Sequence, residues 1–238
     1  MKPELIVDTP TRLAHVFADR FATLAREAIA ARGRFSCALP GGSVAETFLP
    51  VVAGVPLSWE KVDFFWGDER AVGPNHPDSN YGLAKRLLLD PVHVDPRRVH
   101  RMAGEHGDLD AAARAYEEEL VRVLGDPPRI DLVVLGVGPD GHVCSLFPGH
   151  PLLGERVRRV APITDSPKPP PQRITFTMRP LAEARAICGA AFGASKAQAI
   201  RAVVQEPDSS SPAALAVRAS PRAVLLIDPA AASLLPED

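Results

Sequence analysis

The stretch IDLVVLGVG, residues 130–138, decides the fold class of this chain. Apart from Asp131 and the two glycines, every residue in it is aliphatic. A strand formed here would be apolar on both faces, which is typical of a parallel sheet covered by helices on each side. The sequence therefore predicts a buried strand at this place, and the segments around it decide the rest of the fold.

Similar apolar runs alternate along the chain with segments of helical periodicity. The runs that we predict as strands are residues 35–40, 61–69, 99–102, 159–163, 173–177, 186–193 and 223–228. The segments that we predict as helices are residues 9–31, 44–54, 79–89, 108–125 and 194–205. Such alternation predicts an α/β fold with an open, mainly parallel twisted sheet and helices on both faces.

Length and composition favour a single domain over residues 1–238. This length suits one large α/β domain, and an apolar fraction of 46% excludes a wholly disordered chain. The proline-rich stretch 167–172 could mark a domain boundary, but buried strands of the same character lie on both sides of it. We therefore expect this stretch, like residues 206–212, to be a loop within one domain.

Charge and cysteine content indicate which binding partners and which cellular compartment to expect. Lys and Arg number 27 and Asp and Glu 29, which argues against nucleic-acid binding through bulk electrostatics. Cys37, Cys144 and Cys188 form no C-x-x-C pair, which favours a reducing compartment. The start, MKPELIVDTP, lacks the pattern of a signal peptide, and no apolar stretch is long enough to cross a bilayer. We expect a cytoplasmic protein with no nucleic-acid or membrane partner.

Ligands of an open parallel sheet bind beyond the carboxyl ends of its strands, so the residues that follow each strand are candidates. They include small residues, acids, a histidine and basic side chains, namely Gly41, Gly42, Ser43, Asp68, Glu69, Arg70, Asp140, His142, Lys168, Arg173 and Lys196. We expect these residues to gather on one rim of the sheet.

The turn Gly41-Gly42-Ser43 suits an anion. Two glycines allow close approach of the backbone, and the N–H groups at a helix start attract negative charge. By itself this pattern is also that of an ordinary strand-to-helix turn with a serine cap. With Arg173 and Lys196 at other strand ends, the interpretation that we prefer is a phosphate clamp.

His142 is the strongest candidate for a catalytic base. It follows a flexible glycine after the most buried strand, and its ordinary pKa of about 6.5 lets it accept a proton near neutral pH. Asp140 could orient it or shape the turn. The alternatives are a histidine that merely bonds loop backbone, and a Cys–His pair with Cys144, whose two-residue spacing defines no geometry.

Metal and nucleotide sites have weaker support. The other histidines form no ligand spacing such as H-E-x-x-H. Gly136, Gly138 and Gly141 match G-x-G-x-x-G, but Pro139 and Pro148 leave little room for the helix that holds a dinucleotide. We expect no metal and no cofactor.

Several blocks of the sequence resemble 6-phosphogluconolactonases and occur in the same order. They are LPGGS (39–43), FFWGDERAVGPNHPDSNYGLAKRLLL (64–89), VVLGVGPDGHVCSLFPGHP (133–151), KPPPQRITFT (168–177) and GASKAQAI (193–200). The resemblance, to the glucosamine-6-phosphate isomerase/6-phosphogluconolactonase family, spans about residues 38–204. It implies a Rossmann-like fold shared with glucosamine-6-phosphate deaminases and ribose-5-phosphate isomerases.

The resemblance also implies an activity, the hydrolysis of 6-phospho-D-glucono-1,5-lactone in the oxidative pentose phosphate pathway. It makes His142 the residue that activates water, and the glycine turn, Arg173 and Lys196 the phosphate contacts. Arg70 and Lys168 correspond to further substrate contacts, and Arg70 could stabilise the carbonyl oxygen. The family's turn commonly reads GGSTP, whereas this chain has Val44-Ala45 after Ser43, which removes one hydroxyl from the cradle.

Two other functions remain open from the sequence. Deaminases of this fold follow the DGH block with Asn-Glu-Pro, and here Leu146-Phe147-Pro148 provides no carboxylate. A non-catalytic sugar-phosphate sensor would normally carry a DNA-binding segment, and the α/β pattern here begins by about residue 10. We expect a monomer whose partner is a phosphorylated sugar lactone.

Overall fold

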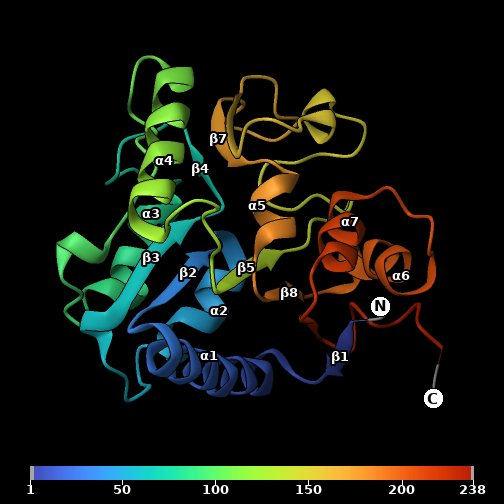
Figure 1. Ribbon diagram of the computed structural model, residues 1–238. Helices are drawn as coiled ribbons and strands as arrows, with labels where there is room; N and C mark the ends of the chain where they lie inside the picture. Colours follow the sequence, from blue (N-terminus) through green and yellow to red (C-terminus); the bar gives the residue numbers. More distant parts are fainter. Residues whose placement is uncertain (1–2, 237–238) are drawn as a thin grey trace.

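A six-stranded sheet, all of whose strands run parallel, forms the centre of the computed structural model, which describes residues 3–236 (Figure 1). Its strands, in spatial order, are β1 (Glu4–Val7), β9 (Ala223–Ile227), β8 (Ile187–Ala191), β5 (Leu132–Gly136), β2 (Phe35–Leu39) and β3 (Val62–Trp66). β2, β3 and β8 are buried along their whole length, as the continuous apolar runs predict.

Helices cover both faces of this sheet. On one face lie α1 (Pro10–Arg32) and α2 (Gly42–Val52), which stack Phe17 on Phe48 with ring centroids 4.5 Å apart. The opposite face packs against α4 (Leu109–Leu124), α5 (Met178–Glu183), α6 (Ala197–Gln205) and α7 (Pro212–Ala219). The predicted fold class is therefore confirmed: an open, mainly parallel α/β sheet with helices on both faces.

A second sheet lies beside the first and is antiparallel. Its order is β4 (Asp68–Arg70), β7 (Arg173–Phe176) and β6 (Val160–Ile163). The predicted strands at 159–163 and 173–177 exist, but an assignment to the parallel sheet is wrong. Their side chains are as buried as those of the central strands, since α4 covers them, so hydrophobicity alone could not distinguish the two sheets.

Other local predictions need correction. Residues 99–102 form no strand, because only Val99 bridges to β3 and the side chain of His100 turns to Asp63 and Glu119. The helix predicted at 79–89 divides into α3 (Asn80–Ala84) and a π-helical turn, η2 (Lys85–Leu89). Short 3-10 turns complete the chain at η1 (Trp59–Lys61), η3 (Pro96–Arg98), η4 (Pro151–Gly154) and η5 (Ala194–Lys196).

Local side chains define the helix ends. Thr9 caps α1 by accepting a hydrogen bond from the N–H of Arg12, and Gly33 ends the helix in the left-handed region at φ 76°. Ser211 caps α7, a helix that sequence reasoning missed. Across residues 3–236, no helix is long and apolar enough to cross a membrane.

Candidate active site

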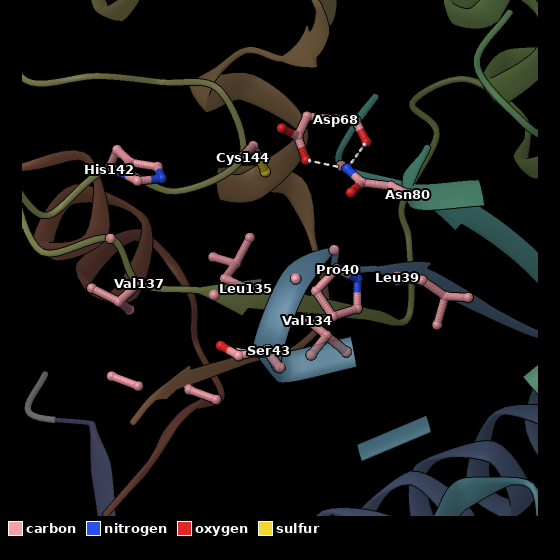
Figure 2. A pocket seen from close by; sticks show the side chains of 18 of the residues that line it. Leu39, Pro40, Ser43, Asp68, Asn80, Val134, Leu135, Val137, His142 and Cys144 are labelled. Carbon is pink, nitrogen blue, oxygen red and sulfur yellow. Dashed lines mark hydrogen bonds between the residues drawn. The ribbon is translucent and has the colours of Figure 1, made fainter. Parts of the chain in front are cut away.

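A cleft of about 180 Å³ opens at the carboxyl ends of β2, β3, β5 and β8 (Figure 2). The sequence-predicted residues that line it are Gly41, Gly42, Ser43, Asp68, Arg70, His142, Arg173 and Lys196. Asp140 and Lys168 lie just behind this lining, where both contact His142. Segments from distant parts of the chain thus converge on one rim of the sheet.

The imidazole of His142 is held through one of its two nitrogens. Its Nδ1 lies 2.5 Å from Oδ1 of Asp140 and 3.1 Å from Nζ of Lys168. Its Nε2 has no hydrogen-bond partner among the described residues. A Cβ on Gly138 would lie 1.9 Å from Nδ1, so the glycine makes room for the ring. Because a carboxylate only accepts, Asp140, the nearer neighbour, favours the tautomer with hydrogen on Nδ1 and a lone pair on Nε2. In this tautomer the ammonium of Lys168 makes no hydrogen bond to the ring and acts on it through its charge.

The surroundings of His142 keep the imidazole neutral. Burial lowers its pKa below the ordinary value, the hydrogen bond from Nδ1 to Asp140 opposes this shift, and the positive charge of Lys168 adds to it. The net pKa is lowered. A neutral ring with an open Nε2 is the form that can take a proton from water at neutral pH.

The glycine turn opens α2. Gly42 has φ 59°, in the left-handed region, and Gly41 provides no side-chain cap to the first N–H groups of the helix. Ser43 is exposed beside them. Val44 and Ala45, where the resemblance implies Thr-Pro, are buried in the core. The cradle therefore consists of backbone N–H groups and one hydroxyl.

The two cations of the predicted clamp differ in their surroundings. Burial, followed by the positive charge of Lys168, lowers the pKa of Lys196, which lines the cleft. Arg173 is 4% exposed and donates from Nε to the carbonyl of Pro170 and from Nη2 to that of Lys168, both at 3.0 Å. Arg173 therefore anchors the proline-rich loop, in addition to placing its charge at the cleft.

A polar cluster lies in the wall opposite His142 (Figure 2). The sequence named its acids, Asp68 and Glu69, as candidates, but Asn80 and Ser145 were missed. Asp68 accepts hydrogen bonds from the hydroxyl of Ser145 at 2.7 Å and from Nδ2 of Asn80 at 3.2 Å. The buried carboxylate of Glu69 accepts from the N–H groups of Asn80 and Tyr81, both at 2.8 Å, and so fixes the start of α3. The block DER…DSNY was the available signal, but its asparagine read as an ordinary helix residue.

Arg70 presents an unused donor. Its Nη1 donates to the carbonyl of Asp78 at 2.6 Å, whereas its buried Nε has no partner within residues 3–236. Buried donors are normally paired, so this nitrogen is available to a ligand.

Two alternative sites have no support in the geometry. Burial raises the pKa of the Cys144 thiol far above its ordinary value, which disfavours a thiolate nucleophile. The glycine motif at 136–141 runs into a loop that reaches His150, so no helix follows these glycines in the chain, as a dinucleotide fingerprint requires. In residues 3–236, no group of three or more His, Cys, Asp or Glu side chains is placed to hold a metal ion.

Comparison with known proteins gives related sequences over nearly the whole chain. A 6-phosphogluconolactonase of Streptomyces coelicolor is 39% identical, over 98% of this chain and 95% of its own length. A solved 6-phosphogluconolactonase of Trypanosoma cruzi superposes with a TM-score of 0.86 at 25% identity, over 99% of this chain and 98% of that chain.

A solved monomeric glucosamine-6-phosphate deaminase shares the fold, with a TM-score of 0.83 at 24% identity over 98% of this chain and all of that chain. The family model described as glucosamine-6-phosphate isomerases/6-phosphogluconolactonase matches residues 8–225. The chain therefore belongs to the glucosamine-6-phosphate isomerase/6-phosphogluconolactonase family.

Proposed function

We propose that this protein hydrolyses 6-phospho-D-glucono-1,5-lactone to 6-phospho-D-gluconate in the oxidative pentose phosphate pathway. One observation carries the proposal: His142, with Nδ1 held and Nε2 open, lines the same cleft as the start of α2 at Gly42 and Ser43. A lactone is an activated ester, so a base for water and stabilisation of the developing oxyanion are sufficient.

The phosphate binds at the glycine turn. The N–H groups at Gly42 and the hydroxyl of Ser43 donate hydrogen bonds to its oxygens, beside the close backbone of Gly41. Lys196 supplies a positive charge, and Arg173 adds a second one from the start of β7. This contact sets the distance between the phosphate and the lactone carbonyl, which must reach His142.

Water then attacks the carbonyl carbon. Nε2 of His142 takes one proton as the water oxygen bonds to C1, while Asp140 keeps Nδ1 protonated and the ring oriented. The unpartnered Nε of Arg70 donates to the carbonyl oxygen as it becomes negative. The bond between C1 and the ring oxygen breaks, and the imidazolium returns the proton to that oxygen. The positive charge of Lys168 disfavours the imidazolium and so favours the return of this proton.

A coupled assay tests this function. The lactone is generated enzymatically from glucose 6-phosphate, and its disappearance is followed with and without the protein, with spontaneous ring opening subtracted. We expect His142→Ala to lower turnover by roughly 10²- to 10⁴-fold. His150→Ala, which removes a histidine bonded to Asp165 outside the cleft, should retain activity. Near-normal turnover by His142→Ala would contradict the proposal.

We also propose that residues 1–238 act as one domain, as a monomer and in the cytoplasm. The pairing of β1 with β9 supports the single domain, because both end regions contribute to one sheet. Free thiols at Cys37, Cys144 and Cys188 support a reducing compartment. Sedimentation velocity and cell fractionation test the oligomeric state and the location.

A further inference from the structure

The carboxamide of Asn80 is a buried polar group in the cleft that the proposed hydrolysis does not use. Asn80 is 2% exposed and extends from α3 toward the cavity, on the side opposite His142 (Figure 2). Its Oδ1 has no hydrogen-bond partner within the described part of the chain. Buried acceptors are normally paired, so this oxygen indicates a donor that arrives with a ligand.

The orientation of the carboxamide follows from its other contacts. Nδ2 of Asn80 donates to the backbone carbonyl of Asp68 at 2.9 Å and to its Oδ1 at 3.2 Å. Both partners are acceptors, so exchange of the amide nitrogen and oxygen would place oxygen against oxygen. Oδ1 is therefore the atom that is left to face away from Asp68.

Gly41 makes room for this oxygen. A Cβ at position 41 would lie 1.9 Å from Oδ1 of Asn80. The backbone of Gly41, at φ −106° and ψ −173°, is extended and open to any residue, so conformation does not require a glycine here. The glycine is required by the close approach of the carboxamide.

The chemistry of the oxygen defines what it can bind. An amide oxygen accepts hydrogen bonds and repels other oxygens that only accept, such as those of a phosphate dianion or a lactone carbonyl. The ring hydroxyls are the donors of a sugar lactone. We propose that Oδ1 of Asn80 accepts a hydrogen bond from one ring hydroxyl of the substrate, which makes Asn80 a specificity-determining residue. This inference rests on the proposed lactone hydrolysis.

Substrates that each lack one hydroxyl test the inference. The 2-deoxy, 3-deoxy and 4-deoxy forms of the 6-phosphorylated lactone are compared with the full lactone, for the wild-type protein and for Asn80→Ala. We expect the wild type to lose roughly 10- to 100-fold in kcat/KM on one of the three. Asn80→Ala should show a similar loss on the full lactone and no further loss on that same deoxy form.

A second variant approaches the same oxygen from the other side. Gly41→Ala retains the asparagine but displaces Oδ1. Because Gly41 also borders the proposed phosphate site, this variant should slow all four lactones, but its ratio of kcat/KM between the full lactone and that deoxy form should fall toward one. Ser145→Ala is the matched control, because it removes the other side-chain hydrogen bond to Asp68. If Asn80 acted only through Asp68, both Asn80→Ala and Ser145→Ala would slow all four lactones by one common factor.

The outcomes separate the inference from the function. Three results together support the inference: turnover of the full lactone, a loss by Asn80→Ala that disappears on one deoxy form, and a lowered ratio of full to deoxy lactone in Gly41→Ala. Equal losses by Asn80→Ala on all four lactones overturn it and leave the lactonase function standing. No turnover of the full lactone by the wild type overturns both.

Discussion

The two ends of strands β2, β3 and β5 differ in how completely their buried polar groups are paired. At the amino ends, polar side chains pair with one another. At the carboxyl ends Glu69 is paired, but Oδ1 of Asn80, Nε of Arg70 and Nε1 of Trp66 have no partner in the described residues. The difference separates polar groups that hold the fold from polar groups reserved for a ligand.

Asp63 shows how complete the pairing is at the amino ends. Its carboxylate is 1% exposed and contacts Nη2 of Arg34 at 2.8 Å, Nε2 of His100 at 3.1 Å and Nη1 of Arg98 at 3.3 Å. The neighbouring Asp131 accepts from both the N–H and the hydroxyl of Ser36. Such satisfied networks specify the structure and leave nothing for a substrate.

Asp63→Ala should have the largest effect on stability. The substitution leaves Arg34 and His100 without their buried partner, so we expect a loss of about 3–5 kcal/mol in the free energy of unfolding. Urea denaturation measures the loss. The protein that remains folded should hydrolyse the lactone at a rate close to wild type. If the fully folded variant lost turnover, the amino ends would also serve catalysis, and the proposed difference between the two ends would be wrong.

The pH dependence of this loss provides a further check. Burial alone would raise the pKa of Asp63, but hydrogen bonds from His100 and Arg34 lower it below its ordinary value. The stabilisation is therefore complete above the ordinary pKa of about 4 and is lost as the pH falls through the lower, folded-state value. The difference between wild type and Asp63→Ala should shrink in the same range.

Asp140→Asn, at the carboxyl ends, should lower activity and leave stability nearly unchanged, the reverse of the effect of Asp63→Ala. An amide in place of the carboxylate weakens the hold on Nδ1 of His142, so we expect kcat/KM to fall by roughly 10- to 100-fold. The free energy of unfolding should change little, because Asp140 is partly exposed. A large loss of stability would show that this pair also serves the fold.

Ser36→Ala should cost less than the loss of Asp63. The hydroxyl donates to the carboxylate of Asp131 and accepts from its N–H, both at 3.0 Å. Its removal leaves that buried N–H unpaired, and we expect a loss of about 1–2 kcal/mol in urea unfolding. Unchanged lactone turnover per folded molecule would support a purely structural role for the amino ends, whereas reduced turnover would contradict it.

Lys168→Met should give the smallest change, a shift in the pH profile. The wild-type rate should rise with pH as His142 loses its proton, with a midpoint below the ordinary histidine pKa of about 6.5. Removing the like charge raises the pKa of His142, so the midpoint should move up by roughly a few tenths of a unit to one unit. Asp140→Asn should move it down. If both variants shifted the midpoint of the kcat/KM profile in the same direction, the opposite effects assigned to Lys168 and Asp140 on the pKa of His142 would be contradicted.

Much of the parallel sheet was predictable because burial on both faces leaves a continuous apolar run, as in β2 and β5. The partner of a strand and its direction leave no such pattern in the sequence. The sequence therefore did not show that β6 and β7 belong to a separate, antiparallel sheet. The cap of α7 at Ser211, followed by a proline at the first helical position, was a readable signal within a stretch predicted as a loop.

The candidate site was predictable where the residue type itself indicates a chemical role. This holds for His142, the glycine turn and Lys196. Asn80 is not, because its importance depends on what its neighbours leave unpaired. Only the contacts with Asp68 and the close approach of Gly41 distinguish this asparagine from one on a solvent-exposed helix start.

The pairing of β1 with β9 has a consequence for biosynthesis. Leu5 lies opposite Leu225, so β1 must wait for a segment that is synthesised much later. Until then, the strand edges that β1 and β8 offer to β9 remain open to pairing with other chains. Such long-range closure is slow. The synthesis of β9 therefore sets the earliest moment at which this sheet can be completed, and chains that still lack β9 expose unpaired strand edges, which favour aggregation.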